Sequence, residues 1–205
     1  MVIMLEAGIQ ITGAILAAGK SERMGTANKL LLEYGEQTII EEVVEQMEKS
    51  SVDDIVIVTG FESDRIENTL ANLINDRVAI IKNGNYNQGR ISSIKCALRF
   101  LYGKSDAALF MVGDKPGVAS ALISKAVDKF RKHYPLILTT HTPFGPGHPI
   151  IFSYRIFDEI LGYEGQNLRD YLIARHKDDV FELYDDTSQI DIDTMEDYQK
   201  LMESY

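Results

Sequence analysis

Residues 14–29, AILAAGKSERMGTANK, hold the side chains best suited to binding a phosphate group. The segment contains two glycines, Gly19 and Gly25, and three cations, of which Arg23 and Lys29 follow the first glycine at wider spacing than Lys20. Glycine lets the backbone approach a ligand closely, and successive exposed N–H groups form an anion-binding hollow. Arginine grips phosphate oxygens with a planar fork, whereas lysine supplies a mobile point charge. These residues predict a phosphate-binding loop; the alternative is a plain turn with two solvated cations.

The letters AGKS in this loop look like the end of a Walker A motif, which requires G-x-x-x-x-G-K-[ST]. If Gly19, Lys20 and Ser21 close that motif, its first glycine must stand at position 14, which is Ala14. Gly13 misses the required place by one residue, and the G-x-G-x-x-G dinucleotide fingerprint is also absent from the loop. The spacing therefore predicts a phosphate-binding design that is not a P-loop.

Carboxylates that could hold a metal ion follow two apolar segments. Asp114 ends the segment AALFMVGD (107–114), beside Lys115, and it either binds Mg²⁺ on a nucleotide triphosphate or only starts a Gly/Pro turn. Asp191 and Asp193 alternate at a later strand end, so either one is a candidate second metal ligand. The positive charge of Lys115 would either weaken metal binding at Asp114 or contact a phosphate.

These residues must be positioned by short apolar runs that alternate with segments of helical period. The alternation predicts a three-layer α/β/α domain with a Rossmann-like, mostly parallel sheet. Strands are expected at 11–18, 54–60, 77–83 and 107–114, and helices at 38–49, 63–74, 90–101 and 119–130. Ligands of such sheets bind outside the carboxyl ends of the strands, where the loop and Asp114 would meet.

The rhythm changes after Tyr134. Strands are expected at 135–140 and 148–153, separated by the turn-rich HTPFGPG (141–147). Helices at 154–162 and 166–175, a strand at 179–185 and a helix from Thr194, its N-cap, complete the expected order. We therefore expect a single domain over 1–205, made of two halves, 11–134 and 135–205.

Composition excludes several classes of function. The 205 residues carry a formal net charge of −10, so non-specific binding to nucleic acid or an anionic membrane is not expected. Cys96 is the only cysteine, so an intrachain disulfide or a thiolate metal cluster is impossible; it reads as a buried small hydrophobe. Residues 1–10 do not resemble a signal peptide, and no run of ~18 apolar residues predicts a membrane span, so we expect a cytoplasmic protein.

The loop LAAGKSERMGTANKLLL resembles the signature L-A-[AG]-G-x-S-x-R-M-G of the MobA-like nucleotidyltransferases, in which a lysine follows shortly. Ala18 resembles the molybdenum cofactor cytidylyltransferase branch, whereas the guanylyltransferase branch usually has glycine there. The resemblance runs from about residue 12 to 203 and includes further segments in family order. These segments are NGNYNQGRISSIKCAL (83–98), GDKP (113–116), GPGHPIIFS (145–153), GQNLRDYLI (165–173) and DIDTMEDY (191–198).

The resemblance implies a nucleotide-diphospho-sugar transferase-like fold and a magnesium-dependent transfer of CMP from CTP to molybdopterin cofactor, with release of pyrophosphate. It implies a possible client molybdenum hydroxylase, and it makes 11–134 the nucleotide-binding half and 135–205 the acceptor-side half of the domain. It assigns catalytic roles to Lys29, Arg23 and Asp114, and metal binding to Asp114 and Asp193. The implied nucleotide-binding residues are Leu16, Ala17, Ala18, Gly19, Lys20, Ser21, Gly25, Lys29, Asn83, Gly89, Ser92 and Ser93, and the acceptor-binding residues are His148, Asn167 and Arg169.

Several of these residues could instead have a purely structural role. The two serines suit helix capping as well as anion binding, and Arg169 suits a solvated helix face. His148 is expected to titrate near neutrality and to contact a phosphate or pterin oxygen, or else to be a structural turn residue. Asn83 is expected to reach the base or ribose.

The chain departs from the family pattern in three places. Lys115 stands where methionine or glutamine is usual, and Met195 replaces a proline, which bears on stability rather than chemistry. The loop from Gly25 to Lys29 is one residue longer than in many cytidylyltransferases. The rival functions are transfer from GTP, transfer to a sugar or polyol phosphate, and non-catalytic carriage of molybdenum cofactor.

Overall fold

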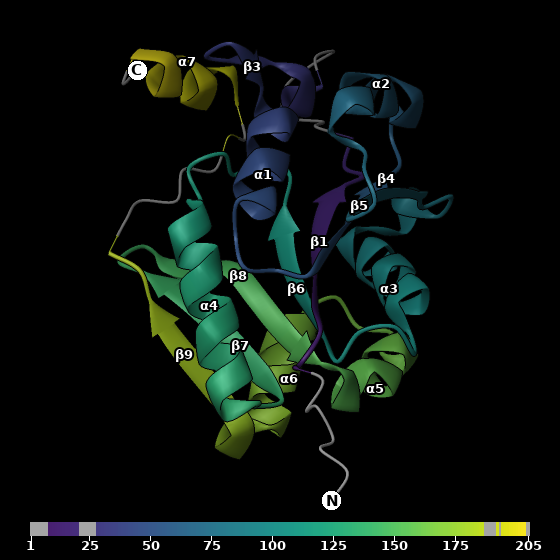
Figure 1. Ribbon diagram of the computed structural model, residues 1–205, viewed down its shortest axis with the longest axis vertical. Helices are drawn as coiled ribbons and strands as arrows, with labels where there is room; N and C mark the ends of the chain where they lie inside the picture. Colours follow the sequence, from purple (N-terminus) through teal and green to yellow (C-terminus); the bar gives the residue numbers. More distant parts are fainter. Residues whose placement is uncertain (1–7, 21–27, 187–191, 193, 204–205) are drawn as a thin grey trace, which may run out of the picture.

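A seven-stranded sheet forms the centre of the protein, as the computed structural model in Figure 1 shows. The structure describes residues 8–20, 28–186, 192 and 194–203. Its strands lie in the spatial order β5 (Val78–Lys82), β4 (Asp54–Thr59), β1 (Ile11–Ala17), β6 (Ala107–Val112), β8 (Gly145–Ser153), β7 (Ile137–Thr142) and β9 (Val180–Tyr184). Strand β8 runs antiparallel to β6 and β7, and the other neighbouring pairs of this sheet are parallel. The expectation of a mostly parallel sheet is confirmed.

Helices cover both faces of the sheet (Figure 1). One face packs against α1 (Ile39–Glu48), α2 (Ser63–Thr69) and α4 (Ser120–His133). The opposite face packs against α3 (Arg90–Leu101), α5 (Phe157–Gly162) and α6 (Leu168–Arg175). Helix α7 (Met195–Glu203) lies near the N-terminal end of α1, where Leu201 and Ile39 share a small cluster. The three-layer α/β/α architecture is therefore as the sequence predicted.

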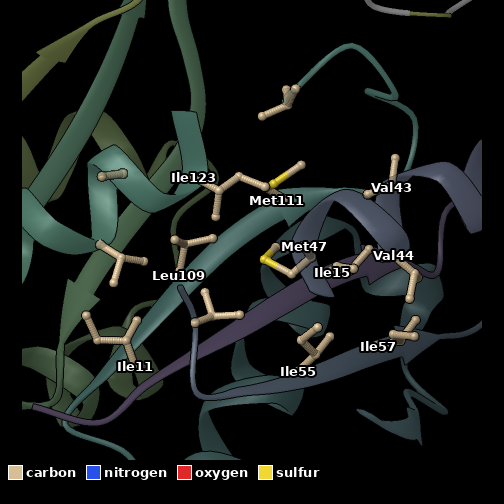
Figure 2. Close-up of a cluster of buried hydrophobic side chains, with 14 of the residues drawn as sticks. Ile11, Ile15, Val43, Val44, Met47, Ile55, Ile57, Leu109, Met111 and Ile123 are labelled. Atoms are coloured by element: carbon tan, nitrogen blue, oxygen red, sulfur yellow. The ribbon is translucent and has the colours of Figure 1, made fainter. Parts of the chain in front are cut away.

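The core on the α1 and α4 side is made of alternate strand residues and the apolar stripes of the two helices. Figure 2 shows part of this cluster, in which buried side chains of β1, β4 and β6 meet those of α1 and α4: Ile11, Ile15, Val43, Val44, Met47, Ile55, Ile57, Leu109, Met111 and Ile123. A Cβ added to Gly13 of β1 would lie 2.6 Å from the Sδ of Met47. Gly13 therefore serves the close packing of α1 against β1.

Capping by side chains fixes the start of two helices. At the head of α1, the Thr38 N–H donates to Glu41 Oε2 at 2.7 Å and the Glu41 N–H donates to Thr38 Oγ1 at 3.4 Å. At the head of α7, Thr194 and Asp197 exchange the same pair of bonds, at 2.8 and 3.2 Å. Such a box satisfies two backbone donors that a helix leaves unpaired. Thr194 acts as the N-cap that the sequence predicted.

The expected turn over 141–147 is wrong in its extent. Strands β7 and β8 continue through most of it, with Thr142 paired to Gly145 and His141 to Pro146, so the turn is only Pro143–Phe144. Pairing the two strands satisfies backbone groups that a long loop would leave to solvent. The register shift between Leu138 and Thr140 lets the ladder continue towards the glycine-rich end of β8.

Smaller departures from the sequence-based expectation occur in short elements. The helix expected at 63–74 ends at Thr69 and continues as the 3₁₀ helix η3 (Ala71–Leu73), and the one expected at 154–162 begins as η5 (Tyr154–Ile156). The strands β2 (Glu33–Tyr34) and β3 (Gln37–Thr38) and the 3₁₀ helices η2 (Lys29–Leu31), η4 (Tyr86–Gln88) and η6 (Lys177–Asp179) were not expected. Within the described residues, no helix has the length and apolarity to cross a membrane.

Candidate active site

A cavity of about 440 Å³ opens at the carboxyl ends of β1 and β6, beside the start of α3. Parallel strands bring their carboxyl ends to one edge of the sheet, which is where ligands of open α/β sheets bind. The first cavity, as we call it, collects most of the described residues that the sequence assigned to nucleotide binding. Those that line it are Leu16, Ala18, Gly19, Lys20, Lys29, Gly89 and Ser93; Asp114, the predicted metal ligand, lines it as well.

The loop after β1 is built to leave room in the first cavity. A Cβ added to Gly19 would meet no atom of the described residues within 4 Å, so none of these residues requires glycine there. Gly60, after β4, differs because its added Cβ would lie 2.7 Å from the Cβ atoms of Ala18 and Tyr86. The backbone therefore packs tightly against Gly60 at Ala18, whereas space remains at Gly19. This space lets the backbone of Gly19 approach a ligand closely. Ala17 lies fully buried in the core and does not line the cavity.

Lys29 and Asp114 meet across the first cavity as an ion pair between Nζ and Oδ2. Lys29 begins η2, whose N-cap Asn28 accepts a hydrogen bond from the Leu30 N–H at 3.2 Å. Asp114 is brought beside the β1 loop because the Gly113 N–H donates to Leu16 O at 3.0 Å, which prolongs the pairing of β6 with β1. The side chains of Lys29 and Asp114 are 13% and 20% exposed, so both open onto the cavity but are mostly enclosed.

Asp114 also has an acceptor atom to spare. Its Oδ1 is buried and accepts no hydrogen bond from the described residues. A buried carboxylate oxygen without a partner is costly, and hard cations such as Mg²⁺ and Mn²⁺ prefer carboxylate ligands. Asp114 therefore fits as one ligand of a divalent metal. No cluster of three or more potential metal ligands occurs in the described part of the chain, so further ligands would come from elsewhere.

A second cavity of about 420 Å³ adjoins the first. It lies between α3, β8 and the start of α6, and all three residues predicted to bind the acceptor line it: His148, Asn167 and Arg169. The two cavities share four lining residues, Leu16, Arg90, Val112 and Asp114. Two ligands, one in each cavity, would therefore meet at the ion-paired Asp114.

His148 is neutral in this environment. Burial of its ring and the positive charges of Lys115 and Arg90 lower its pKa from 6.5 to about 4, against the opposing effects of a hydrogen bond to Phe110 O and the charge of Asp114. Since a carbonyl only accepts, Nδ1 donates to Phe110 O, at 3.3 Å. The expectation that His148 titrates near neutrality is therefore wrong. Lys115, the residue that departs from the family's usual methionine or glutamine, explains part of the low pKa, because it is buried and its positive charge disfavours a charged His148 ring.

Asn167 and Arg169 lie at the start of α6, as the sequence predicted. Asn167 is the exposed N-cap residue, and its side chain makes no capping bond to the helix. Arg169 is half-buried, donates to Thr140 O at 3.3 Å, and burial lowers its guanidinium pKa from the ordinary value. Its placement on the wall of a cavity, rather than on a solvated helix face, favours a binding role.

Asn83 is buried and does not line either cavity. Its Nδ2 donates to Ser92 Oγ at 2.8 Å and Ser93 Oγ at 3.0 Å, and its Oδ1 accepts from the Asn85 N–H at 2.9 Å. Ser92 Oγ donates in turn to Gly89 O at 2.8 Å. Asn83 thus holds the turn that precedes α3, where Gly89 has a φ of +87° that favours glycine.

Some site residues escaped sequence reasoning, and others lie outside the described residues. Arg90 lines both cavities, and Tyr86 and Asn87 line the first, yet none was singled out. The position of Arg90 directly after Gly89, at the expected helix start, was the available signal. The predicted residues that lie outside the described residues are Ser21, Arg23, Gly25, Asp191 and Asp193.

The mostly parallel sheet, with two adjoining cavities at the carboxyl ends of its strands, is the architecture of an α/β enzyme that binds two ligands side by side. Consistent with this class, the sequence profile of the MobA-like NTP transferase domain matches residues 13–180. The chain therefore belongs to the MobA-like NTP transferase family, a family of nucleotidyltransferases.

Individual relatives agree with this assignment. The molybdenum cofactor cytidylyltransferase of Escherichia coli K12 is 29% identical over 197 residues, which cover 93% of this chain and 95% of that protein. Rv0371c of Mycobacterium tuberculosis is 28% identical, with a TM-score of 0.79 over 96% of this chain and 98% of that chain, and it has also been solved in complex with manganese. CMP:2-keto-3-deoxy-manno-octonic acid synthetase is 12% identical, with a TM-score of 0.78 over 95% and 99% of the two chains. This last similarity concerns the fold, which is that of the nucleotide-diphospho-sugar transferases.

Proposed function

We propose that the chain transfers CMP from CTP to the terminal phosphate of molybdopterin cofactor and releases pyrophosphate. The observation that carries the proposal is that two cavities of similar size share Asp114 and three other lining residues. This arrangement suits a nucleotide in one cavity and an acceptor in the other, with their reacting phosphates at the common wall. The choice of CTP and molybdopterin draws on the similarity to the cytidylyltransferase of E. coli.

The triphosphate would lie in the first cavity, against the loop after β1. Lys20 and Lys29 supply positive charge there, and the open backbone at Gly19 lets the loop amides approach the phosphates. Arg23 belongs to the same segment and would add a fork for the leaving pyrophosphate. In a protein of net charge −10, this local charge is needed to attract an anionic substrate.

The reaction needs no general base from the protein. An anionic oxygen of the acceptor phosphate attacks the α-phosphorus of CTP and forms the new P–O bond. The bond from the α-phosphorus to the α,β-bridging oxygen breaks, and its electron pair leaves with pyrophosphate. Positioning and charge neutralisation supply most of the catalysis in such phosphoryl chemistry. His148 is neutral and donates its Nδ1–H to Phe110 O. We therefore propose that it forms part of the polar wall of the second cavity and transfers no proton.

A divalent metal would bind at Asp114, whose Oδ1 lacks a partner within the described residues. The manganese complex of Rv0371c supports a metal in this family, and we propose Mg²⁺ for this chain. Asp193, outside the described residues, is the proposed second ligand. When bound, the metal would neutralise charge that develops on the phosphates. Lys29 pairs with Asp114 in this structure. When the metal and the triphosphate bind, Lys29 would leave Asp114 to the metal and contact the triphosphate instead.

Pyrophosphate release tests the proposed substrates. Purified protein with Mg²⁺ and molybdopterin cofactor is supplied with CTP, GTP, ATP or UTP in parallel reactions. The proposal predicts release that is selective for CTP and depends on the acceptor. Selective release with GTP would overturn the base assignment. Release only when a sugar or polyol phosphate replaces molybdopterin would overturn the acceptor, and nucleotide binding without any release would favour a carrier.

A further inference from the structure

Arg90 occupies a place in the site that no other cation of the described chain shares. It is the first residue of α3 and lines both the first and the second cavity. Among the described residues, Lys20 and Lys29 line only the first cavity, and Arg169 lines only the second. Arg90 therefore stands at the wall where a nucleotide and an acceptor would meet.

The guanidinium of Arg90 is not committed to the protein's own acids. The side chain is exposed, and within the described residues it makes no hydrogen bond or ion pair. Lys29 by contrast pairs with Asp114, and Arg131 in the body of the fold pairs with Asp53. An unpaired cation that faces two cavities in an acidic protein is suited to an anionic ligand.

The position of Arg90 in its helix is unfavourable for folding. The N-terminal end of a helix carries a partial positive charge, so a cation there destabilises the helix and an acid would stabilise it. The first turn of α3 contains no acidic residue that would compensate, and the helix's other arginine, Arg99, lies in the last turn where a cation is favoured. The positive charge of Arg90 also reaches the second cavity, because its electrostatic interaction with His148 helps to lower the pKa of that ring. Stability does not account for an arginine at this position.

We propose that Arg90 is a catalytic residue that contacts both the acceptor phosphate and the α-phosphate of the nucleotide. The proposal rests on the proposed function. The two reacting phosphates are both anionic, and bringing them together raises their electrostatic energy. A guanidinium has five N–H donors in a rigid plane, so one edge can donate to each phosphate while its charge offsets their repulsion. As the acceptor oxygen bonds to the α-phosphorus and pyrophosphate leaves, Arg90 keeps both groups in line.

The proposal predicts the kinetic signature of Arg90 substitutions. Arg90→Met should lower kcat by about a hundredfold or more and raise the KM for the acceptor, because a charged donor to the reacting groups is lost. The affinity for CTP alone should change only a few-fold, since Lys20 and Lys29 remain. Arg90→Lys should restore part of the charge effect but not the two-sided contact. Arg99→Met, in the same helix and remote from both cavities, is the matched control and should behave as the wild type.

A binding experiment separates this inference from the choice of substrates. Protein saturated with a non-hydrolysable CTP analogue and Mg²⁺ is titrated with inorganic phosphate, followed by ³¹P NMR, with the phosphate standing in for the acceptor. Wild type and Arg99→Met should bind phosphate equally, and Arg90→Met at least tenfold more weakly. Equal binding by Arg90→Met, or no binding by wild type, would overturn the role of Arg90. Loss of phosphate binding in Arg90→Met together with no pyrophosphate release from CTP and molybdopterin would support Arg90 and refute only the proposed substrates.

Discussion

Replacing Lys29 by methionine is expected to weaken catalysis and, at the same time, to strengthen metal binding to the nucleotide-free protein. Methionine keeps an unbranched side chain of similar length but removes the ammonium that pairs with Asp114 Oδ2. Turnover falls because the triphosphate loses a neutralising cation. Metal binding strengthens because a divalent ion no longer competes with Lys29 for the carboxylate of Asp114.

The magnitudes follow from the exposure of the pair. With side chains 13% and 20% exposed, Lys29 and Asp114 lie between a surface pair, worth about 0–1 kcal/mol, and a fully buried one, where losing one partner costs about 3–5 kcal/mol. An intermediate value of about 1–3 kcal/mol corresponds to metal affinity that rises roughly 5- to 150-fold. Loss of one well-placed donor in a phosphate site lowers kcat by about 10²–10³-fold.

The assay is a Mn²⁺ titration without nucleotide, in which electron paramagnetic resonance measures the free ion. Lys82→Met is the matched control, because Lys82 pairs with Asp64 on the surface, where the two side chains are 59% and 88% exposed. Wild type and Lys82→Met should bind Mn²⁺ alike, and Lys29→Met more tightly, with circular dichroism confirming that each variant is folded. Unchanged or weaker Mn²⁺ binding by folded Lys29→Met would refute the assignment of Asp114 as a metal ligand that Lys29 masks.

Further predictions concern stability. The pKa of His148 is about 4 in the folded state and 6.5 in the unfolded state, so the unfolded state binds more protons between these pH values. As the pH falls from 7 to 5, the free energy of unfolding of the wild type should therefore decrease by about 2 kcal/mol through this group. His148→Gln should lose correspondingly less in urea unfolding at the two pH values, and an identical loss would contradict the low pKa. Asn83→Ala leaves the hydroxyl oxygens of Ser92 and Ser93, at the start of α3, without their donor and should reduce the free energy of unfolding by about 1–3 kcal/mol, whereas a stability equal to wild type would contradict its buried role. Gly13→Ala would press a Cβ against Met47 and cost about 1–3 kcal/mol, while Gly19→Ala, whose Cβ meets no atom of the described residues, should stay within about 0.5 kcal/mol and weaken CTP binding. Calorimetric melting and CTP titration of both variants check this contrast.

The sheet and its helices were predictable because their signals are local. β1, β4, β5 and β6 are each a short apolar run, and α7 carries the capping threonine, Thr194, that the sequence predicted. The extent of the β7–β8 hairpin was not predictable in the same way. Gly145, Pro146 and Gly147 have the composition of a loop, and only pairing with residues 140–142 of β7 makes them a strand. Contacts between distant residues decided this segment, and propensity did not.

The site shows the same division. The sequence predicted that the loop after the first strand and Asp114 lie together, and Lys29 and Asp114 do line one cavity, with His148 and Arg169 on the wall of the adjoining one. Electrostatic detail depends on neighbours that are remote in sequence. The pKa of His148 is set partly by Lys115 and Arg90, which lie 33 and 58 positions away in the chain, so its neutrality was not visible in the motif GHP. The hydrogen bonds that commit Asn83 to a structural role also appear only in three dimensions.

The most direct test of the central claim is a single-turnover reaction with CTP labelled at the α-phosphate, carried out with molybdopterin cofactor and excess enzyme. If nucleotide and acceptor react at the wall that holds Asp114, the label appears in a dinucleotide product and the pyrophosphate is unlabelled. Asp114→Asn should form that product at least about a hundredfold more slowly. Label that remains in CTP with wild-type protein, or equal rates with Asp114→Asn, would contradict the account.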